Sequence, residues 1–186
     1  MLVDSHCHLD FPDLAGKVDD ALALMRQNDV THALCVSVTL QEFPQVRALA
    51  ERYPNLYASV GVHPDYDNVP QVTEQELVKL AIHPRVVAIG ETGLDHYRVK
   101  GGAEWQRERF RTHIRAIYRA SAHGKVRMMF PMVSSQSELA RALQLCTDVQ
   151  DELATRGVPH DKTLEIGLMI ETPIAVWISD VLAREA

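Results

Sequence analysis

The sequence predicts an α/β protein built from six strand–helix units with parallel strands. Three observations support this fold class. Six short apolar runs show little in–out alternation, which is typical of strands buried on both faces of a parallel sheet. Longer amphipathic segments lie between these runs in strict alternation, the order that parallel strands with right-handed crossovers require. Polar residues follow several of the runs directly, where the carboxyl ends of the strands would meet.

The predicted strands are rich in Val, Ile, Leu and Ala. They cover Met1–Val3, His32–Val38, Leu56–Val62, Val86–Ile89, Val126–Val133 and Leu164–Ile170. The last two runs contain an apolar set that we interpret as core, because methionine fills irregular gaps. This set comprises Met128, Met129, Phe130, Met132, Leu168, Met169 and Ile170.

Five amphipathic segments predict helices, and a sixth helix is predicted from about Ile174 to the end. The five cover Val18–Asn28, Gln41–Tyr53, Thr73–Ile82, Glu104–Ala122 and Ser135–Arg156. Thr73 and Ser135 are each followed three positions later by a glutamate, which predicts a capping box at both helix starts. Gly124 and Gly157 stand where the two long helices should end.

Six units admit two architectures. One is an incomplete or open TIM-like barrel, because a closed barrel normally has eight strands. The alternative is a doubly wound open sheet. At 186 residues the chain has the length of one domain with a core, so we expect residues 1–186 to form a single α/β domain. The loosest predicted loop is His96–Ala103.

Composition limits the function. A net charge of −6 argues against a general nucleic-acid-binding surface, although a local basic cluster could still hold a phosphate. The three cysteines are too few for a disulfide framework, so we expect a cytoplasmic protein. No apolar run approaches the ~18 residues of a membrane span, and the early charges do not suit a signal peptide, so no membrane partner is expected.

The segment "SHCHLD" offers a pair of candidate metal ligands. His6 and His8 stand two residues apart, so in an extended chain both side chains point the same way and could share one ion. The alternative is one surface histidine and one hydrogen-bonded core histidine. The flanking Asp4 and Asp10, at the end of an N-terminal strand, favour the metal site.

"VVAIGETGLDHY" supplies a carboxylate at the end of the fourth predicted strand. Glu91 could bind a metal, bridge two metals or act as a general base. The alternative is a helix cap or an ion pair with Arg98 or Lys100. In "VGVHPDYD", His63 could face the same site or could be a turn residue fixed by the following proline.

Taken together, these motifs resemble the TatD family of metal-dependent deoxyribonucleases. The stretches "MLVDSHCHLDFPDL", "ASVGVHPDYDN", "VVAIGETGLDHYR" and "EWQRERFRTHIRA" carry the resemblance, which covers about residues 1–116. It implies a (βα) barrel that hydrolyses DNA with divalent metal ions, either Zn²⁺, Mg²⁺ or Mn²⁺. It implies His6, His8 and Glu91 as metal ligands, with His63 and Asp95 near the metals or the substrate.

The second half resembles a different family, the phosphoenolpyruvate-binding (βα) barrel of enzyme I of the sugar phosphotransferase system. "IRAIYRASAHGKVRMMFPMVSSQSEL" and "LEIGLMIETPIAVWISDVLA" carry this resemblance, over about residues 112–186. It implies that Glu171 is the remnant of a site for magnesium and phosphoenolpyruvate. We expect the aspartate, the catalytic cysteine and the phosphate-binding arginines of that family to be missing.

The two resemblances together predict a chimera, recombined or engineered, that joins two barrel fragments inside one helix near residues 110–120. Residues ~1–116 would supply four deoxyribonuclease-like units and residues ~117–186 two enzyme I-like units. The TatD-like family also places metal ligands at the ends of later strands, and this chain has no histidine in "RMMFPMV". We therefore expect a partial metal site and no full native activity.

Two other functions stay open. One is a metal-dependent phosphodiesterase with residual activity, in which case nucleic acid would be a partner. The other is a weak phosphate or phosphoenolpyruvate binder. Six strands leave an unpaired edge, and exposed edges tend to pair with another chain, so a homodimer is also predicted.

Overall fold

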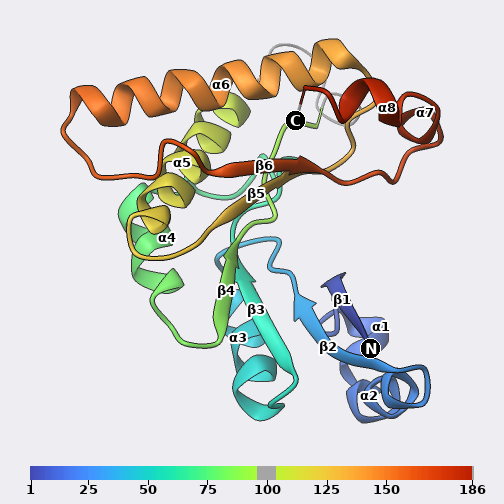
Figure 1. The fold of residues 1–186 in the computed structure, drawn as a ribbon. Coiled ribbons are helices and arrows are strands. Elements are labelled where there is room, and N and C mark those ends of the chain that lie inside the picture. Colours follow the sequence, from blue (N-terminus) through green and yellow to red (C-terminus); the bar gives the residue numbers. More distant parts are fainter. Residues whose placement is uncertain (96–103, 186) are drawn as a thin grey trace. The chain divides into compact units, whose positions relative to one another are not determined.

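The computed structural model describes residues 1–95 and 104–185 (Figure 1). The loop predicted at His96–Ala103, with Arg98 and Lys100, lies outside these residues. The chain divides into two compact units, Met1–Gln106 and Arg107–Ala186. That residues 1–186 form a single domain stays a prediction.

The N-terminal unit is a four-stranded parallel sheet with helices between the strands (Figure 1). Its strands are β1 (Leu2–Cys7), β2 (Val30–Cys35), β3 (Leu56–Val60) and β4 (Val86–Ile89). Its helices are α1 (Pro12–Ala15), α2 (Val18–Gln27), α3 (Phe43–Arg52) and α4 (Glu74–Ala81). The strands pair in the order β1-β2-β3-β4. A doubly wound sheet reverses its order at a switch point, so this sequential order favours the incomplete barrel.

The core of this unit forms where the amphipathic helices meet the sheet. Leu22 of α2 and Val46 of α3 are buried against Ala33, Cys35 and Leu56 of the strands. The predicted helix α4 begins at the predicted capping box: Thr73 Oγ1 accepts from the Glu76 amide, and the Glu76 carboxylate accepts from the Thr73 amide. Predicted bounds of these elements agree with the structure to within about three residues, except for β1, which runs four residues beyond the predicted Met1–Val3 and so includes His6. The short α1 was not predicted.

The C-terminal unit contains a two-stranded parallel sheet and most of the long helix that precedes it. Helix α5 spans Glu104–Ser121, and β5 (Arg127–Phe130) pairs in parallel with β6 (Glu165–Leu168). Between them lies α6 (Gln136–Thr155), which ends at Gly157 as predicted, with a left-handed φ of 66°. The prediction of α/β units with parallel strands is confirmed, and the described strands form two sheets rather than one.

Three details of this unit differ from the predictions. The last predicted helix is two short helices, α7 (Pro173–Trp177) and α8 (Ser179–Leu182), because the backbone at Ile178 leaves helical geometry. Ser135 caps α6, but the Glu138 carboxylate accepts from the Ser134 amide and hydroxyl instead of closing a capping box.

The third difference concerns the predicted methionine core. Met128 and Phe130 are buried, whereas Met129 and Met132 are 50% and 66% exposed. Successive residues of a strand point to opposite faces, and β5 buries one face only. Ile170 is also exposed, at 45%, since it follows the end of β6. The methionine run is therefore only half core.

Candidate metal centre

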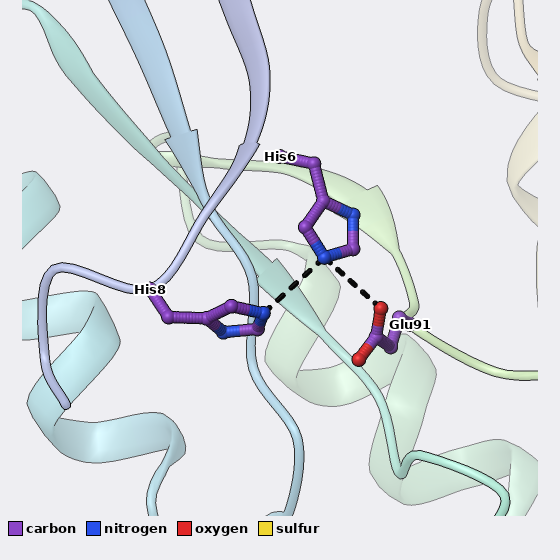
Figure 2. A group of neighbouring side chains, drawn as sticks. All are labelled: His6, His8 and Glu91. Atoms are coloured by element: carbon purple, nitrogen blue, oxygen red, sulfur yellow. Dashed lines mark hydrogen bonds and ion pairs between the residues drawn. The ribbon is translucent and has the colours of Figure 1, made fainter. Parts of the chain in front are cut away.

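The two histidines at the end of β1 converge on one point in space (Figure 2). His6 lies in β1 and His8 just beyond it, and the Nε2 atoms of their rings are 3.2 Å apart. Asp4, which flanks the pair in sequence, accepts a hydrogen bond at Oδ1 from the His6 amide at 3.0 Å and so holds the backbone of the strand end. The two side chains point toward the same place, as their spacing predicts, and their ring planes meet at 76°.

The ring of His8 is fixed on two sides. Its Nδ1 lies 3.1 Å from the carbonyl oxygen of Val36, just beyond β2, and this carbonyl can only accept, so Nδ1 donates. Phe11 stacks on the ring with a centroid separation of 4.5 Å. With its proton on Nδ1, His8 presents the lone pair of Nε2 to the cluster, as a metal-binding histidine does.

Glu91 brings a carboxylate to the same point from the end of β4. Its Oε2 lies 3.1 Å from Nε2 of His6, and the ligand atoms of His6, His8 and Glu91 all lie within 4.8 Å of one another (Figure 2). The side chain is about one-quarter exposed, at 23%, so solvent reaches one side of the cluster. The structure therefore brings the three predicted ligands together.

A hydrogen-bond network under the cluster positions the backbone of Glu91. The Glu91 amide donates to the carbonyl oxygen of Ser37, and the buried Ser59 hydroxyl donates to the carbonyl oxygen of Gly90 at 2.6 Å. The Ser37 amide in turn donates to Ser59 Oγ at 3.1 Å. This network ties the ends of β2, β3 and β4 together.

Neither serine was predicted to take part in the site. A signal was present, because each is a small polar residue within a predicted buried apolar run, "ALCVS" and "YASV". Burial of a hydroxyl costs free energy unless it is hydrogen-bonded, so such a serine indicates a partner. The identity of that partner depends on which strand ends meet, which the pattern does not specify.

The charges around Glu91 favour its ionised form. Burial alone would raise the pKa of this carboxyl group. The hydrogen bond with His6 and the charges of His63, His6 and His8 outweigh burial, and the pKa of Glu91 lies below its ordinary value. An ionised carboxylate is the form that binds a divalent cation, and metal binding displaces protons from the imidazole nitrogens that become ligands.

Asp10, the second flanking aspartate, is held differently from Asp4. Its Oδ1 is buried and has no hydrogen-bond partner among the described residues. Burial raises the pKa of this carboxyl group, while its own backbone amide and the charge of His8 oppose the rise. Asp10 lies outside the group whose ligand atoms converge.

His63 joins the edge of the cluster. Its Nε2 lies 3.6 Å from Oε1 of Glu91, and its Nδ1 forms a short contact with Oδ1 of Asp65. A carboxylate on one nitrogen orients the imidazole and favours a proton there, so the other nitrogen faces Glu91. The predicted placement of His63 near the candidate ligands agrees with this geometry.

The other two predicted site residues lie outside the converging group. Asp95 is held through its backbone amide, which donates to Oε1 of Gln106 at 3.1 Å, and Gln106 also donates to the carbonyl oxygen of Pro64. Glu171 belongs to the C-terminal unit, where its Oε1 accepts from the Met132 amide at 2.7 Å. A role for either residue in binding stays a prediction.

The geometry of the cluster suits one divalent metal ion. Three ligands at about 2.0–2.2 Å in a tetrahedral site lie ~3.4 Å from one another. The separations of 3.2 Å and 3.1 Å from His6 Nε2 are close to this spacing, and the third separation is within 4.8 Å. Two imidazoles and a carboxylate are a donor set that zinc accepts, with a fourth position left for water or substrate.

Comparison with protein families divides the chain in two. Residues 3–129 match the family described as TatD related DNase. Residues 98–186 match the family described as PEP-utilising enzyme, PEP-binding domain. The two predicted resemblances are confirmed, and the matches overlap around α5, as expected for fragments joined inside that helix.

Individual relatives follow the same division. The metal-dependent hydrolase YcfH of Escherichia coli K12 is 43% identical over 116 residues, which cover 61% of this chain and 43% of YcfH. The phosphoenolpyruvate-protein phosphotransferase of Lactococcus lactis subsp. cremoris is 42% identical over 76 residues, which cover 41% of this chain and 13% of that protein. The chain thus spans less than half the length of either of these relatives.

Solved structures support the fold. The TatD homologue YJJV of Escherichia coli K12 superposes with a TM-score of 0.62 at 27% identity, covering 77% of this chain and 55% of that one. An amidohydrolase from Saccharomyces cerevisiae superposes with a TM-score of 0.61 at 18% identity, which bears on the fold alone. No helix among the described residues is long and apolar enough to cross a membrane. The chain belongs to the TatD related DNase family through residues 3–129 and continues into a segment that resembles the PEP-binding domain of PEP-utilising enzymes.

Proposed function

We propose that this protein is a hybrid, located in the cytoplasm, that holds a single divalent metal ion at His6, His8 and Glu91 and lacks the full activity of either parent family. The observation that carries the proposal is the convergence of three ligand atoms within 4.8 Å. The hydrogen bond from His8 Nδ1 to Val36 adds support, because it leaves Nε2 available for the metal.

The ligand count limits the chemistry. A pair of metal ions that stabilises both the attacking and the leaving oxygen needs further ligands. The segment Arg127–Val133, at β5, contains no histidine, cysteine or carboxylate. Glu171, which follows β6, is engaged with the Met132 amide. Three ligands with one open position suit one ion and not two.

Residual hydrolysis of phosphodiesters is the second candidate function. A single bound metal can polarise a phosphoryl oxygen and lower the pKa of a water molecule. The pair of His63 and Asp65 favours this candidate, since His63 Nε2 lies 3.6 Å from Glu91 and could exchange a proton with a group bound there. Single-stranded DNA would then be the substrate.

Weak binding of phosphate or phosphoenolpyruvate is the third candidate, and it concerns the C-terminal unit alone. Glu171 is its predicted magnesium ligand. That carboxylate already accepts a hydrogen bond from Met132, whose backbone is left-handed with φ of 57°. A magnesium ion would have to share or displace this bond, so we expect affinity to be low.

Metal titration tests the first proposal. The protein is treated with a chelator and titrated with Zn²⁺, Mn²⁺ and Mg²⁺ by isothermal calorimetry, with metal content measured by mass spectrometry. We expect one ion per chain, and a loss of at least ~100-fold in affinity for the double variant His6→Ala/His8→Ala, because two of three ligands are gone. His32→Ala, which removes an exposed histidine of the same unit, should bind metal as tightly as the unsubstituted protein.

Activity assays then separate the candidates. The hybrid proposal predicts bound metal with no cleavage of single-stranded DNA. Cleavage that the double variant abolishes would support the second candidate, whereas cleavage that survives in the double variant would indicate a contaminating nuclease. The third candidate is tested by calorimetry with phosphoenolpyruvate and Mg²⁺, which compares the affinity of the unsubstituted protein with that of Glu171→Gln.

We also propose that the protein is a homodimer formed through a sheet edge. Among the described strands, β1 pairs with β2 only, so its other side carries backbone groups without a strand partner. Leu2 and Val3 on this strand are 61% and 62% exposed. Exposed apolar edges tend to pair with another chain. A monomeric mass by light scattering at micromolar concentration would reject this proposal.

A further inference from the structure

Two cysteine side chains touch directly behind the candidate metal ligands. Cys7 of β1 and Cys35 of β2 are partners in the parallel register, and their Sγ atoms are 3.8 Å apart. Cys7 stands between His6 and His8, but residues alternate along a strand, so its side chain points to the opposite face. There it packs against the core cluster that contains Cys35.

Paired positions on neighbouring strands have about the spacing that a disulfide requires. Neighbouring strands lie about 4.8 Å apart, and disulfides form between Cα atoms about 4.4–6.8 Å apart. Both side chains point to the same side of the sheet, as their sulfur contact shows. Bond formation therefore needs rotation of the side chains and a closer approach of the two paired strands.

The two sulfurs differ in their access to solvent. Cys35 is fully buried, whereas Cys7 is partly exposed. A small oxidant can thus reach the pair from the Cys7 side. Cys146, the third cysteine, belongs to the C-terminal unit, where it is buried and donates to the sulfur of Met128 at 3.7 Å. It serves as an internal reference thiol.

We propose that Cys7 and Cys35 form an oxidisable dithiol, which hydrogen peroxide converts into an intramolecular disulfide. A thiolate of the pair attacks one peroxide oxygen, the O–O bond breaks, and hydroxide leaves, so that sulfur becomes a sulfenic acid. The second thiol attacks this sulfur, the S–O bond breaks, and the oxygen departs as water. In total two thiols and one peroxide yield one disulfide and two waters.

The disulfide would act on the metal centre next to it, a consequence that rests on the proposed metal site. To form the bond, the sulfurs must approach from 3.8 Å to about 2.05 Å, which pulls on the one residue between His6 and His8. Metal sites lose affinity when supporting groups shift their ligands. By linkage, a metal that favours the present ligand geometry should slow or oppose oxidation of the pair.

Peptide mapping tests the dithiol without reference to metal or activity. The native, metal-free protein is exposed to hydrogen peroxide, its remaining thiols are alkylated, and its proteolytic peptides are examined by mass spectrometry. We expect a Cys7–Cys35 linked peptide that dithiothreitol cleaves, together with alkylated Cys146. A linked peptide absent at peroxide doses that oxidise Cys146, or a link of Cys7 to Cys146 or to a second chain, would overturn the proposal.

Variants separate the dithiol from the metal site. Cys35→Ala should leave a sulfenic acid at Cys7, trapped by dimedone, and no linked peptide. In the unsubstituted protein, oxidation should lower zinc affinity about tenfold or more, and reduction should restore it. Zinc affinity that is equal in both states, with the disulfide mapped, would overturn the coupling. A reduced protein that binds no zinc would refute the proposed function, while the mapping would still decide whether the disulfide forms.

Discussion

A Cβ atom on Gly61 would lie 2.5 Å from the carbonyl carbon of Gly90, so the chain just beyond β3 and the chain just beyond β4 meet through two glycines. A real Cβ atom does not approach backbone so closely. Gly90 precedes Glu91, the only carboxylate of the candidate metal group. The close approach of these glycines is therefore part of what sets the position of the Glu91 side chain.

The first prediction follows from this contact. Gly61→Ala should move the Gly90 backbone, because neither partner is a flexible side chain. We expect a loss of about 1–3 kcal/mol in the free energy of unfolding and a metal affinity about tenfold lower or more. Gly16→Ala is the matched control in the same unit, since a Cβ atom there meets nothing within 4 Å. Denaturant titration and calorimetry measure both effects, and equal behaviour of the two variants would contradict the contact.

The Ser59 hydroxyl carries the second prediction. Ser59→Ala removes the donor to the Gly90 carbonyl and the acceptor for the Ser37 amide. Leaving such buried groups without this partner costs about 1–3 kcal/mol of stability, and metal affinity should fall because Glu91 loses support. Chemical denaturation compares the variant with Ser5→Ala, which alters an exposed serine of the same unit. Equal unfolding midpoints for both variants would count against the network.

Much of this site could be predicted because its residues are local in sequence. The spacing of His6 and His8 fixes their shared direction on an extended strand, and Glu91 follows a short apolar run that predicts a strand. The supporting residues were not predictable in the same way. Whether Ser37 meets Ser59 depends on pairing between β2 and β3, and residue patterns identify strands without specifying their partners.

The same limit applies to the second half of the chain. The alternation of apolar segments predicts β5 and β6, but not that they pair with one another in a separate sheet. At the start of α6, both Ser134 and Ser135 are close enough in sequence to bond to the Glu138 carboxylate. The residue pattern does not show which of the two serines will do so. In the structure the Glu138 carboxylate accepts a hydrogen bond from the Ser134 amide. Ser135 Oγ caps the helix by accepting from the Glu138 amide.

A third prediction concerns Arg85, which donates to a group of backbone carbonyls and stacks on Tyr57 with 4.3 Å to the ring centroid. The carbonyls belong to Ala50, Tyr53, Pro54 and Leu56. Arg85→Ala should cost about 1.5–3 kcal/mol, because these acceptors lose a charged donor.

Arg85→Lys should recover only part of that loss, because an ammonium group lacks the planar fork that reaches several acceptors at once. Arg52→Ala is the control. Arg52 is exposed and makes one contact over the ring of Tyr53, at 5.0 Å, which is worth about 0.5–1 kcal/mol. Thermal unfolding measures the series, and full recovery by lysine would show that charge alone matters.

The last prediction is a pH dependence that originates in α5. His113 is fully buried, and its Nδ1 lies 2.8 Å from the carbonyl oxygen of Arg109. Burial, helped by the charge of Arg109, lowers the pKa of His113 to about 4 from an ordinary value of 6.5, although the hydrogen bond opposes the shift. The folded protein therefore keeps His113 neutral at pH values where the unfolded chain already binds a proton.

The sign follows from this difference in proton binding. Above about pH 6.5 neither state is protonated at His113, so the residue contributes no pH dependence. Between about pH 6.5 and 4 the unfolded state binds the extra proton, and His113 should remove roughly 3 kcal/mol of stability over that range. Urea titrations at several pH values give the free energy of unfolding as a function of pH. This free energy should change less with pH in His113→Gln than in the unsubstituted protein, while the control His123→Gln, at an exposed site, should behave like the unsubstituted protein. Parallel curves for all three proteins would mean that His113 is protonated in the folded state as readily as in the unfolded chain.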